Sequence, residues 1–163
     1  MAPTSGTAKV TTPADTQILI TREFDAPRHL VWRTYTEPEL IKRWWAGDHG
    51  TVTSVEVDLR VGGRWRYVMT ATGGFEVAFH GEYREVSAPE RLVNTEAFEG
   101  IPDPDDNAAL TTLTLTEKDG RTYLELLVEH KDQAGRDAHL NSGMEAGMQK
   151  SYDALERVAA ALR

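Results

Sequence analysis

The feature that most constrains the fold is a mismatch between a long run of strands and the one helix available to cover them. Residues 51–130 alternate apolar and polar side chains in segments separated by turns, which predicts about six antiparallel strands. The closing segment has apolar residues at three- and four-residue steps, which predicts one long amphipathic helix. A helix is about 10 Å wide and strands lie about 4.8 Å apart, so the sheet must curl around the helix. The sequence therefore predicts a curved sheet wrapped on one helix, with space left between them.

A strand and two short helices precede this region. The string ILITREF at residues 18–24 alternates two sets of side chains, with Arg22 in the same set as the isoleucines, which is typical of a strand. Asp25 is a helix-capping residue type, and Thr36 followed by Pro38 repeats the signal for a helix start. The sequence therefore predicts an α+β chain ordered β-α-α-β6-α, with about seven strands in one antiparallel sheet.

The closing helix has two possible starts. Its apolar side chains recur from Leu140 to Leu162. Ser142 and Glu145 have the spacing of a capping box, which would start the helix late. Alternatively, the helix begins at Asp137 and Ser142 lies inside it. We favour this earlier start.

Glycines mark turns and bends along the strand-rich region. Asp119-Gly120 is the strongest short-range signal for a hairpin turn. Gly62-Gly63 is interpreted as a strand reversal, because no helix follows it as a phosphate-binding loop would need. Gly81, inside an expected strand, predicts a bend that helps the sheet to curl.

Length and composition indicate one folded domain. A chain of 163 residues with 40% apolar and 27% charged side chains can bury a sizeable core. Its opening residues are small, polar and proline-bearing, and they lack the apolar stretch of a signal peptide. We therefore predict a flexible tail over residues 1–16 and a single domain over residues 17–163.

Charge and composition also narrow the range of partners. The formal net charge is −8, and no run of lysine and arginine is longer than two residues, which argues against a nucleic-acid partner. No apolar run approaches the roughly 20 residues that span a bilayer, so membrane insertion is not expected. The chain has no cysteine, which excludes disulfides and thiolate chemistry and is consistent with the cytoplasm, where we expect the protein.

Aromatic side chains dominate the strand faces that are expected to turn inward. Trp65 and Tyr67 share one such face, and Phe79 and Tyr83 share another if the strand has a bulge near Gly81. Core packing would explain each residue alone, whereas together they could form a wall for an apolar ligand.

The expected helices add further candidates for the same space. Trp44 and Trp45 cannot both point into one core, so one is expected to pack under the helix pair while the other flanks the cavity or lies on the surface. Methionines at helical spacing fill a core or adapt to ligands of changing shape. The candidate ligand-binding residues are Trp44, Trp65, Tyr67, Phe79, Tyr83, His130, Met144, Met148 and Tyr152.

The histidines give no metal-binding pattern and one weak catalytic candidate. They are scattered at positions 29, 49, 80, 130 and 139, without the spacing of a zinc site. His130 ends the last strand and could act as a general base if a carboxylate pairs with it, although a structural hydrogen bond is the commoner role. We assign no catalytic residue and expect no metal and no cofactor.

Four strings together resemble a known family. They are FDAPRHLVWRTYTEPELIKRWWAG, VEVDLRVGGRWRYVM, FHGEYREVSAPERLVNT, and LTLTEKDGRTYLELLVEH followed by SGMEAGMQKSYDALERV. In this order they look like the SRPBCC (START/pollen-allergen-like) superfamily, and within it the branch named after the activator of heat-shock-protein-ninety ATPase. The resemblance covers residues 17–162. It implies a helix-grip fold in which a curved sheet holds the C-terminal helix around a cavity.

The resemblance does not supply a reaction, so three functional hypotheses stay open. Superfamily members include hydrophobe carriers, polyketide cyclases, hormone receptors and co-chaperone domains. The first hypothesis is a domain that binds a small hydrophobic or amphipathic molecule in its cavity. The second is a cyclase, dehydratase or hydrolase that uses polar groups in the same cavity, with Tyr67, Tyr83 and His130 as candidates. The third is an interaction module for a chaperone ATPase, and a homodimer is compatible with all three.

Overall fold

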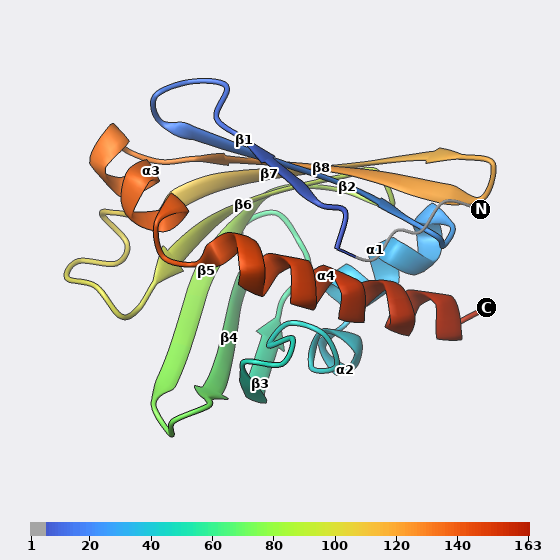
Figure 1. Ribbon diagram of the computed structural model, residues 1–163, viewed down its shortest axis with the longest axis horizontal. Helices are drawn as coiled ribbons and strands as arrows, with labels where there is room; N and C mark the ends of the chain where they lie inside the picture. The colour runs from blue at the N-terminus through green and yellow to red at the C-terminus, as the bar shows by residue number, and fades with distance from the viewer. Residues whose placement is uncertain (1–5) are drawn as a thin grey trace.

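The computed structural model describes residues 6–163 and shows one curved antiparallel sheet with a long helix across its concave side (Figure 1). The sheet has eight strands in the order β1-β2-β8-β7-β6-β5-β4-β3. The strands are β1 Lys9–Thr11, β2 Gln17–Phe24, β3 Gly50–Val57, β4 Arg64–Ala71, β5 Glu76–Ser87, β6 Arg91–Phe98, β7 Ala109–Lys118 and β8 Arg121–Glu129. The helices are α1 Arg28–Thr36, α2 Pro38–Ile41, α3 Gln133–Leu140 and α4 Met144–Ala161. The predicted α+β helix-grip architecture is confirmed.

The sheet curls where its strands are irregular. Register shifts interrupt the pairing of β3 with β4 between Val52 and Ser54, and that of β5 with β6 between Tyr83 and Glu85. Gly81 lies beside the second shift, where a Cβ atom would collide with the Thr95 carbonyl oxygen of β6. A side chain at position 81 would therefore push β5 away from β6, which explains why this bend needs glycine.

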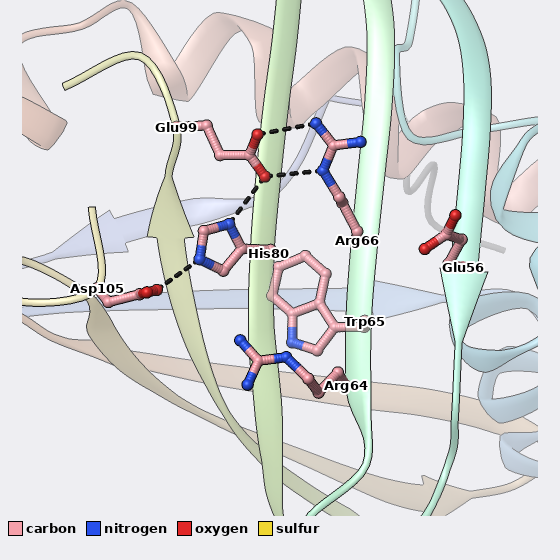
Figure 2. Close-up of a pocket in the computed structure, with 7 residues that line it drawn as sticks. All are labelled: Glu56, Arg64, Trp65, Arg66, His80, Glu99 and Asp105. Atoms are coloured by element: carbon pink, nitrogen blue, oxygen red, sulfur yellow. Dashed lines mark hydrogen bonds and ion pairs between the residues drawn. The ribbon is translucent and has the colours of Figure 1, made fainter. Parts of the chain in front are cut away.

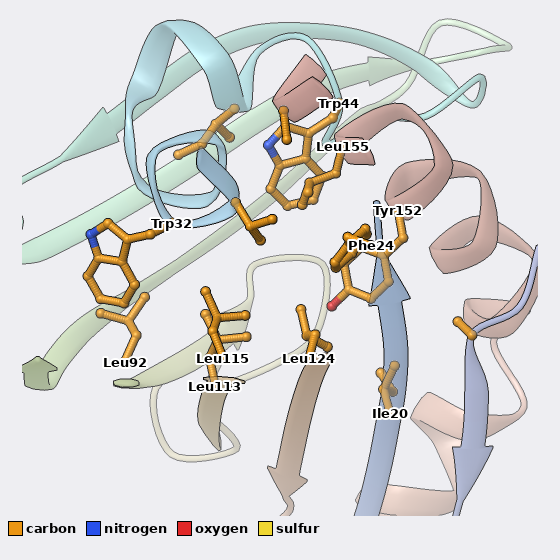
Figure 3. Close-up of a cluster of buried hydrophobic side chains, with 14 of the residues drawn as sticks. Ile20, Phe24, Trp32, Trp44, Leu92, Leu113, Leu115, Leu124, Tyr152 and Leu155 are labelled. Atoms are coloured by element: carbon orange, nitrogen blue, oxygen red, sulfur yellow. The ribbon is translucent and has the colours of Figure 1, made fainter. Parts of the chain in front are cut away.

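The core fills the space between the helices and one half of the sheet (Figure 3). The inward side chains of β2, β7 and β8 alternate with outward ones, as the period-two pattern predicts. Ile18, Ile20, Leu113 and Leu124 are at most 3% exposed, and Leu155 of α4 is completely buried against this group. Burial of each such side chain stabilises the fold by about 1.5–3 kcal/mol relative to its exposure to water.

A buried ion cluster ties α4 to the sheet. Arg22 lies on the inward face of β2 and is 2% exposed. Its Nη1 donates to Asp153 Oδ1 at 2.8 Å and its Nη2 donates to Glu156 Oε1 at 3.2 Å, both on α4. The guanidinium therefore fixes the position of the helix along the sheet, and its own charge is paired.

The N-terminal segment is more ordered than expected. Strand β1 lies within residues 1–16, and Lys9, Val10 and Thr11 pair with Thr21, Ile20 and Leu19 of β2. The prediction of a flexible tail is therefore wrong for Lys9–Thr11, because a strand of three residues is too short to show an alternating pattern. Residues 1–5 of the predicted tail lie outside the described residues.

The short helices are capped differently from the prediction. Helix α1 begins after Pro27 without a side-chain cap from Asp25. Instead, Glu117 of β7 accepts a hydrogen bond from the Arg28 backbone N–H at 2.6 Å. Thr36 does not cap α2 either, because its hydroxyl donates to the Trp32 carbonyl oxygen at 2.7 Å. A carboxylate from a distant strand replaces the local cap of α1, which sequence spacing does not reveal.

The C-terminal amphipathic segment forms two helices rather than one. Helix α3 ends at Leu140, and the chain turns at Asn141–Gly143 before the long helix α4 begins at Met144. The favoured start at Asp137, with Ser142 inside the helix, is therefore wrong. Gly143 has φ 83°, a left-handed conformation that glycine adopts without strain. No helix within residues 6–163 is long and apolar enough to cross a membrane.

Candidate functional site

The adjacent tryptophans after α2 point in different directions. Trp44 is 5% exposed, and its Nε1 donates to the Thr34 carbonyl oxygen at 2.7 Å. Its ring lies against Tyr35 and Tyr152 in the core. Trp45 is half-buried, because successive residues of a helical turn are about 100° apart. The structure therefore packs the predicted Trp44 into the core and leaves its neighbour Trp45 partly accessible.

Trp45 completes a continuous aromatic surface on the concave side of the sheet. Its ring centroid lies 5.4 Å from that of Tyr67 on β4 and 5.8 Å from that of Phe79 on β5. The chain of contacts extends from Tyr67 to Trp65 at 4.7 Å and from Phe79 to Phe98 at 5.0 Å. We call these five residues the aromatic surface. It contains the predicted Trp65, Tyr67 and Phe79 and two residues that the sequence prediction did not include.

The inward side chains of this half of the sheet are less covered than those of the core. Tyr67 and Phe79 are half-buried, as are Val55 and Val57 on the edge strand β3. On β2 and β8, the inward Ile18, Ile20, Leu124 and Val128 are almost fully buried. The apolar side chains on this half of the concave face therefore keep accessible surface that the side chains of the core do not.

Two pairs of tyrosines lie beside the aromatic surface. Tyr67 lies near Tyr83, and Tyr35 of α1 lies near Tyr152 of α4, so that the two hydroxyls of each pair influence each other's pKa. Burial raises the pKa of Tyr35 and Tyr67 well above the usual range and raises the pKa of Tyr152 to about 12. These hydroxyls therefore stay neutral at physiological pH and act as hydrogen-bonding groups.

The carboxyl group of Glu96 on β6 lies near both pairs of tyrosines. Its charge reaches Tyr35, Tyr67 and Tyr152 and helps to raise the pKa of each. Burial raises the pKa of Glu96 itself to about 7. We call Glu96 and these tyrosines, with Tyr83, the Glu96 site. It combines residues of α1, α4 and three neighbouring strands.

The Glu96 carboxyl group faces space rather than a protein partner. Among the described residues, no side-chain hydrogen bond or ion pair to Glu96 is formed. In residues 6–163, every fully enclosed side-chain nitrogen or oxygen has a hydrogen-bond partner. An unpartnered carboxyl oxygen of the half-buried Glu96 must therefore border space that a water-sized molecule can reach. The Glu96 carboxyl group is therefore largely desolvated and still keeps some accessible surface.

Helix α4 meets the aromatic surface through the loop that follows Trp45. Ser151 Oγ donates to the Trp45 carbonyl oxygen at 2.9 Å. Gly147 lies under the same loop, and a Cβ atom there would be 3.5 Å from His49 Nε2. The predicted Met144 and Met148 are half-buried and pack against the core from this part of the helix. The face of α4 that carries the methionines therefore adjoins the aromatic surface.

His130 is not brought together with the tyrosines. Its Nε2 lies 3.0 Å from His139 Nδ1 of α3. Burial lowers the pKa of His130, and burial followed by the nearby His130 lowers the pKa of His139 to about 4. The two rings form a neutral contact that fastens α3 to the end of β8. The carboxylate partner that a general base would need is therefore replaced by a second imidazole.

A separate polar cluster occupies the outer face of the sheet (Figure 2). Glu99 accepts hydrogen bonds from Arg66 Nη2 at 2.8 Å and Nε at 2.9 Å, and it contacts His80 Nδ1 at 2.8 Å. The other nitrogen of His80 contacts Asp105. These groups border a depression of about 440 Å³. It is lined by Glu56, Arg64, Trp65, Arg66, His80, Glu99 and Asp105.

The hydrogen-bonding groups of the outer cluster are partners of one another. Hydrogen bonds from Arg66 and then from His80 lower the pKa of Glu99 to about 2. Asp105 and then Glu99 raise the pKa of His80. Within the described residues, no group of three or more histidine or carboxylate side chains is arranged to hold a metal ion. The cluster therefore fastens the acidic loop after β6 to β4 and β5, and its charges are already matched.

Sequence reasoning missed Glu96, Tyr35 and Phe98 as members of the site, and it left open which of Trp44 and Trp45 flanks it. A signal for Glu96 exists in the register, because Glu96 pairs with Ala109, which is buried on the inward face of β7. A charged residue opposite a buried alanine is unusual for a one-sided sheet. That register is not available from the sequence, because the loop of residues 99–108 between the two strands does not fix how they pair.

Comparison with known proteins places the chain in a family. Residues 25–160 match the family described as activator of Hsp90 ATPase homolog 1-like protein. The chain belongs to this family. Membership of this Hsp90-activator-like family, part of the SRPBCC superfamily, confirms the resemblance predicted from the sequence. Among curated proteins, no similar sequence is found.

Solved structures of Hsp90-activator-like proteins share the fold. A crystal structure of a Rhodobacter sphaeroides protein is 25% identical with a TM-score of 0.86, over 94% of this chain and 98% of that chain. A crystal structure of a Mycobacterium smegmatis protein is 28% identical with a TM-score of 0.80, over 95% and 96%. One from Nitrosomonas europaea is 26% identical with a TM-score of 0.81, over 92% and 97%. The helix-grip arrangement described above is therefore the arrangement of the family.

Proposed function

We propose that this protein binds a small amphipathic molecule on the concave face of the sheet, between strands β3–β6 and helix α4. The fold of the family commonly binds hydrophobic ligands, which supports the class of ligand. The apolar part of the molecule would lie on the aromatic surface, and its polar part would meet the Glu96 site. Specificity would come from these few polar groups, as in other mainly apolar sites.

The observation that carries the proposal is the unpartnered Glu96 carboxyl beside half-buried aromatic rings. A core that served packing alone would not retain a desolvated carboxyl without a hydrogen-bond partner, because that arrangement costs free energy. The Arg22 cluster on the other half of the sheet illustrates the alternative, in which an interior charge is fully paired. A bound molecule would supply the partner that the chain itself does not offer to Glu96.

Acid–base catalysis in the same space is a second candidate. The Glu96 carboxyl, with a pKa of about 7, exists in both protonation states near neutral pH and lies close to the Tyr67–Tyr83 pair. A group of this kind can donate or accept a proton in a cyclase, dehydratase or hydrolase reaction. A turnover rate that follows a pKa near 7 and disappears in Glu96→Gln would distinguish the enzyme from a carrier. The chaperone-ATPase interaction, the homodimer and the cytoplasmic location stay predictions.

Ligand binding can be tested through the tryptophan fluorescence of the protein. A panel of small aromatic and aliphatic molecules is added, and quenching and the melting temperature Tm are followed. A binder should quench the Trp45 signal and raise Tm. Phe79→Ala should weaken its binding about tenfold, because a central ring of the aromatic surface is removed.

The matched control is Tyr123→Ala on β8, whose side chain is 46% exposed and lies on the outer face of the sheet. Its effect on affinity should be less than twofold. Equal effects of the two substitutions, or no quenching by any member of the panel, would contradict binding on the concave face.

A further inference from the structure

We infer that the molecule bound on the concave face carries a protonated amine, and that this amine pairs with the carboxylate of Glu96. The inference rests on the proposed function, because it names the chemical class of ligand for that same site. It is carried by the set of charges and hydrogen-bonding groups that face the space beside β6.

The groups around Glu96 offer no positive charge of their own. Tyr35, Tyr67, Tyr83 and Tyr152 are neutral phenols, because burial raises the pKa of each. Arg22 is near enough to Tyr152 to influence it, but its guanidinium is held by Asp153 and Glu156 at 2.8 and 3.2 Å. Among the described residues, the Glu96 carboxyl is therefore the ionisable group in this space whose charge is not neutralised by a partner.

Anionic, neutral and cationic ligands would interact very differently with the Glu96 carboxyl group. An anion would face a second negative charge in a desolvated setting, which costs free energy. A neutral alcohol would form one ordinary hydrogen bond. An ammonium group would form a charge-assisted hydrogen bond, which is roughly twice as strong as a neutral one, and would neutralise the carboxylate.

The aromatic surface favours the same class of ligand. Its rings present faces and edges of indole and phenol next to Glu96, with Tyr67 common to both groups. The faces of such rings attract an ammonium group and stabilise it by about 0.5–2 kcal/mol. An amine that is attached to an apolar body can therefore place its charge at Glu96 and its body on the rings.

Protonation provides a signature of this pairing. Before the ligand binds, burial keeps the pKa of Glu96 at about 7, so the carboxyl is mostly protonated at pH 6. A neighbouring ammonium group lowers that pKa and drives the proton off. Binding of an amine at pH 6 should therefore release close to one proton, whereas a neutral alcohol should release none.

The test uses a matched series of probes on the full chain. The probes are 2-phenylethylamine, 2-phenylethanol and 3-phenylpropionate, with longer phenylalkyl homologues of each, in titration calorimetry at pH 6 and pH 8. The amines should bind at least tenfold more tightly than the alcohols of the same length, and the carboxylates most weakly. In two buffers of different ionisation enthalpy, only the amines should show proton release.

The variant Glu96→Gln should remove the preference for amines and the proton release, while its affinity for the alcohols stays within twofold of the wild type. The control Glu125→Gln changes an exposed carboxylate on the outer face of β8 and should leave all affinities unchanged. Far-ultraviolet circular dichroism of both variants confirms that they are folded.

The test distinguishes failure of the amine inference from failure of the proposed function. If the alcohols bind the wild type as tightly as the amines do, or if Glu96→Gln keeps the preference, the amine inference is wrong and the binding function stands. If no probe of any charge binds to the wild type or to Glu96→Gln, the proposed function fails and the inference fails with it.

Discussion

Two carboxylates at the end of strand β6 lie in opposite situations. Glu96 faces the concave side, has no protein partner among the described residues, and has a pKa raised by burial to about 7. Glu99 faces the outer side just after the strand, and hydrogen bonds from Arg66 and His80 lower its pKa to about 2. The two groups are three positions apart and chemically identical. Their difference arises from the side chains that other strands and helices bring to each face.

This difference separates structural charge from charge that is available to a ligand. On the outer face, each charge of the cluster is matched by a neighbour on β4, β5 or the following loop, so the groups hold the loop in place. On the inner face, the Glu96 carboxyl has no neighbour of opposite charge among the described residues, and its side chain keeps some exposed surface. A carboxyl group whose pKa is raised by burial and that has no protein partner is therefore a candidate for a functional role. A carboxylate whose pKa is lowered by hydrogen bonds to its neighbours has a structural role.

The largest expected effect concerns an interior charge that does have partners. Arg22→Met should lower the free energy of unfolding by about 3–5 kcal/mol, because Asp153 and Glu156 would lose the cation that neutralises them in the interior. Urea unfolding at pH 7 measures the change. The control Arg91→Met breaks the exposed pair with Glu85 and should cost less than about 1 kcal/mol. Equal losses would mean that pairing inside the molecule matters no more than pairing outside.

A smaller effect of opposite sign is expected at Glu96. Its pKa is raised from 4.5 to about 7 in the folded state, so the folded state binds more protons than the unfolded state in that window and the protein loses stability as pH rises through it. Gln does not ionise. Glu96→Gln should therefore raise the free energy of unfolding at pH 8 by about 2–3 kcal/mol and have little effect at pH 4.

Urea unfolding of wild type and Glu96→Gln between pH 4 and pH 8 gives this pH profile, with Glu125→Gln as the exposed control. A difference between wild type and Glu96→Gln that does not change with pH would remove the distinction between the two faces of β6.

The smallest effect is expected at Glu99. Its pKa is lowered from 4.5 to about 2, so its contribution to stability is present above pH 4.5 and is lost as the pH falls toward 2. Its side chain is 26% exposed and that of Arg66 is 42% exposed, so solvent weakens the pair. Glu99→Gln should cost about 1 kcal/mol at pH 7 and nothing near pH 2, as measured by thermal unfolding. A gain in stability at pH 7 would show that the outer ion pairs do not hold the loop after β6 in place.

Much of the fold follows from local patterns that act over a few residues. The alternation of Ile18, Ile20 and Arg22 places all three on the inward face of β2, as observed. The turn at Asp119-Gly120 has φ of 54° and 75°, which suits a hairpin of the predicted kind. In contrast, the α1 cap from Glu117 depends on a contact between distant segments, and strand β1 is too short to show an alternating pattern. These are the features that the sequence prediction did not include.

For the candidate site, the sequence alone determined which residue types would face inward on each strand. Side chains alternate along a strand whatever surrounds it, so Trp65, Tyr67 and Phe79 could be placed together before the structure was known. Only the tertiary structure decided that Trp45 joins them, that His130 does not, and that Glu96 meets tyrosines from α1 and α4. The physical reason is that hydrogen bonding and desolvation depend on neighbours from elsewhere in the chain, which only the packed fold brings together.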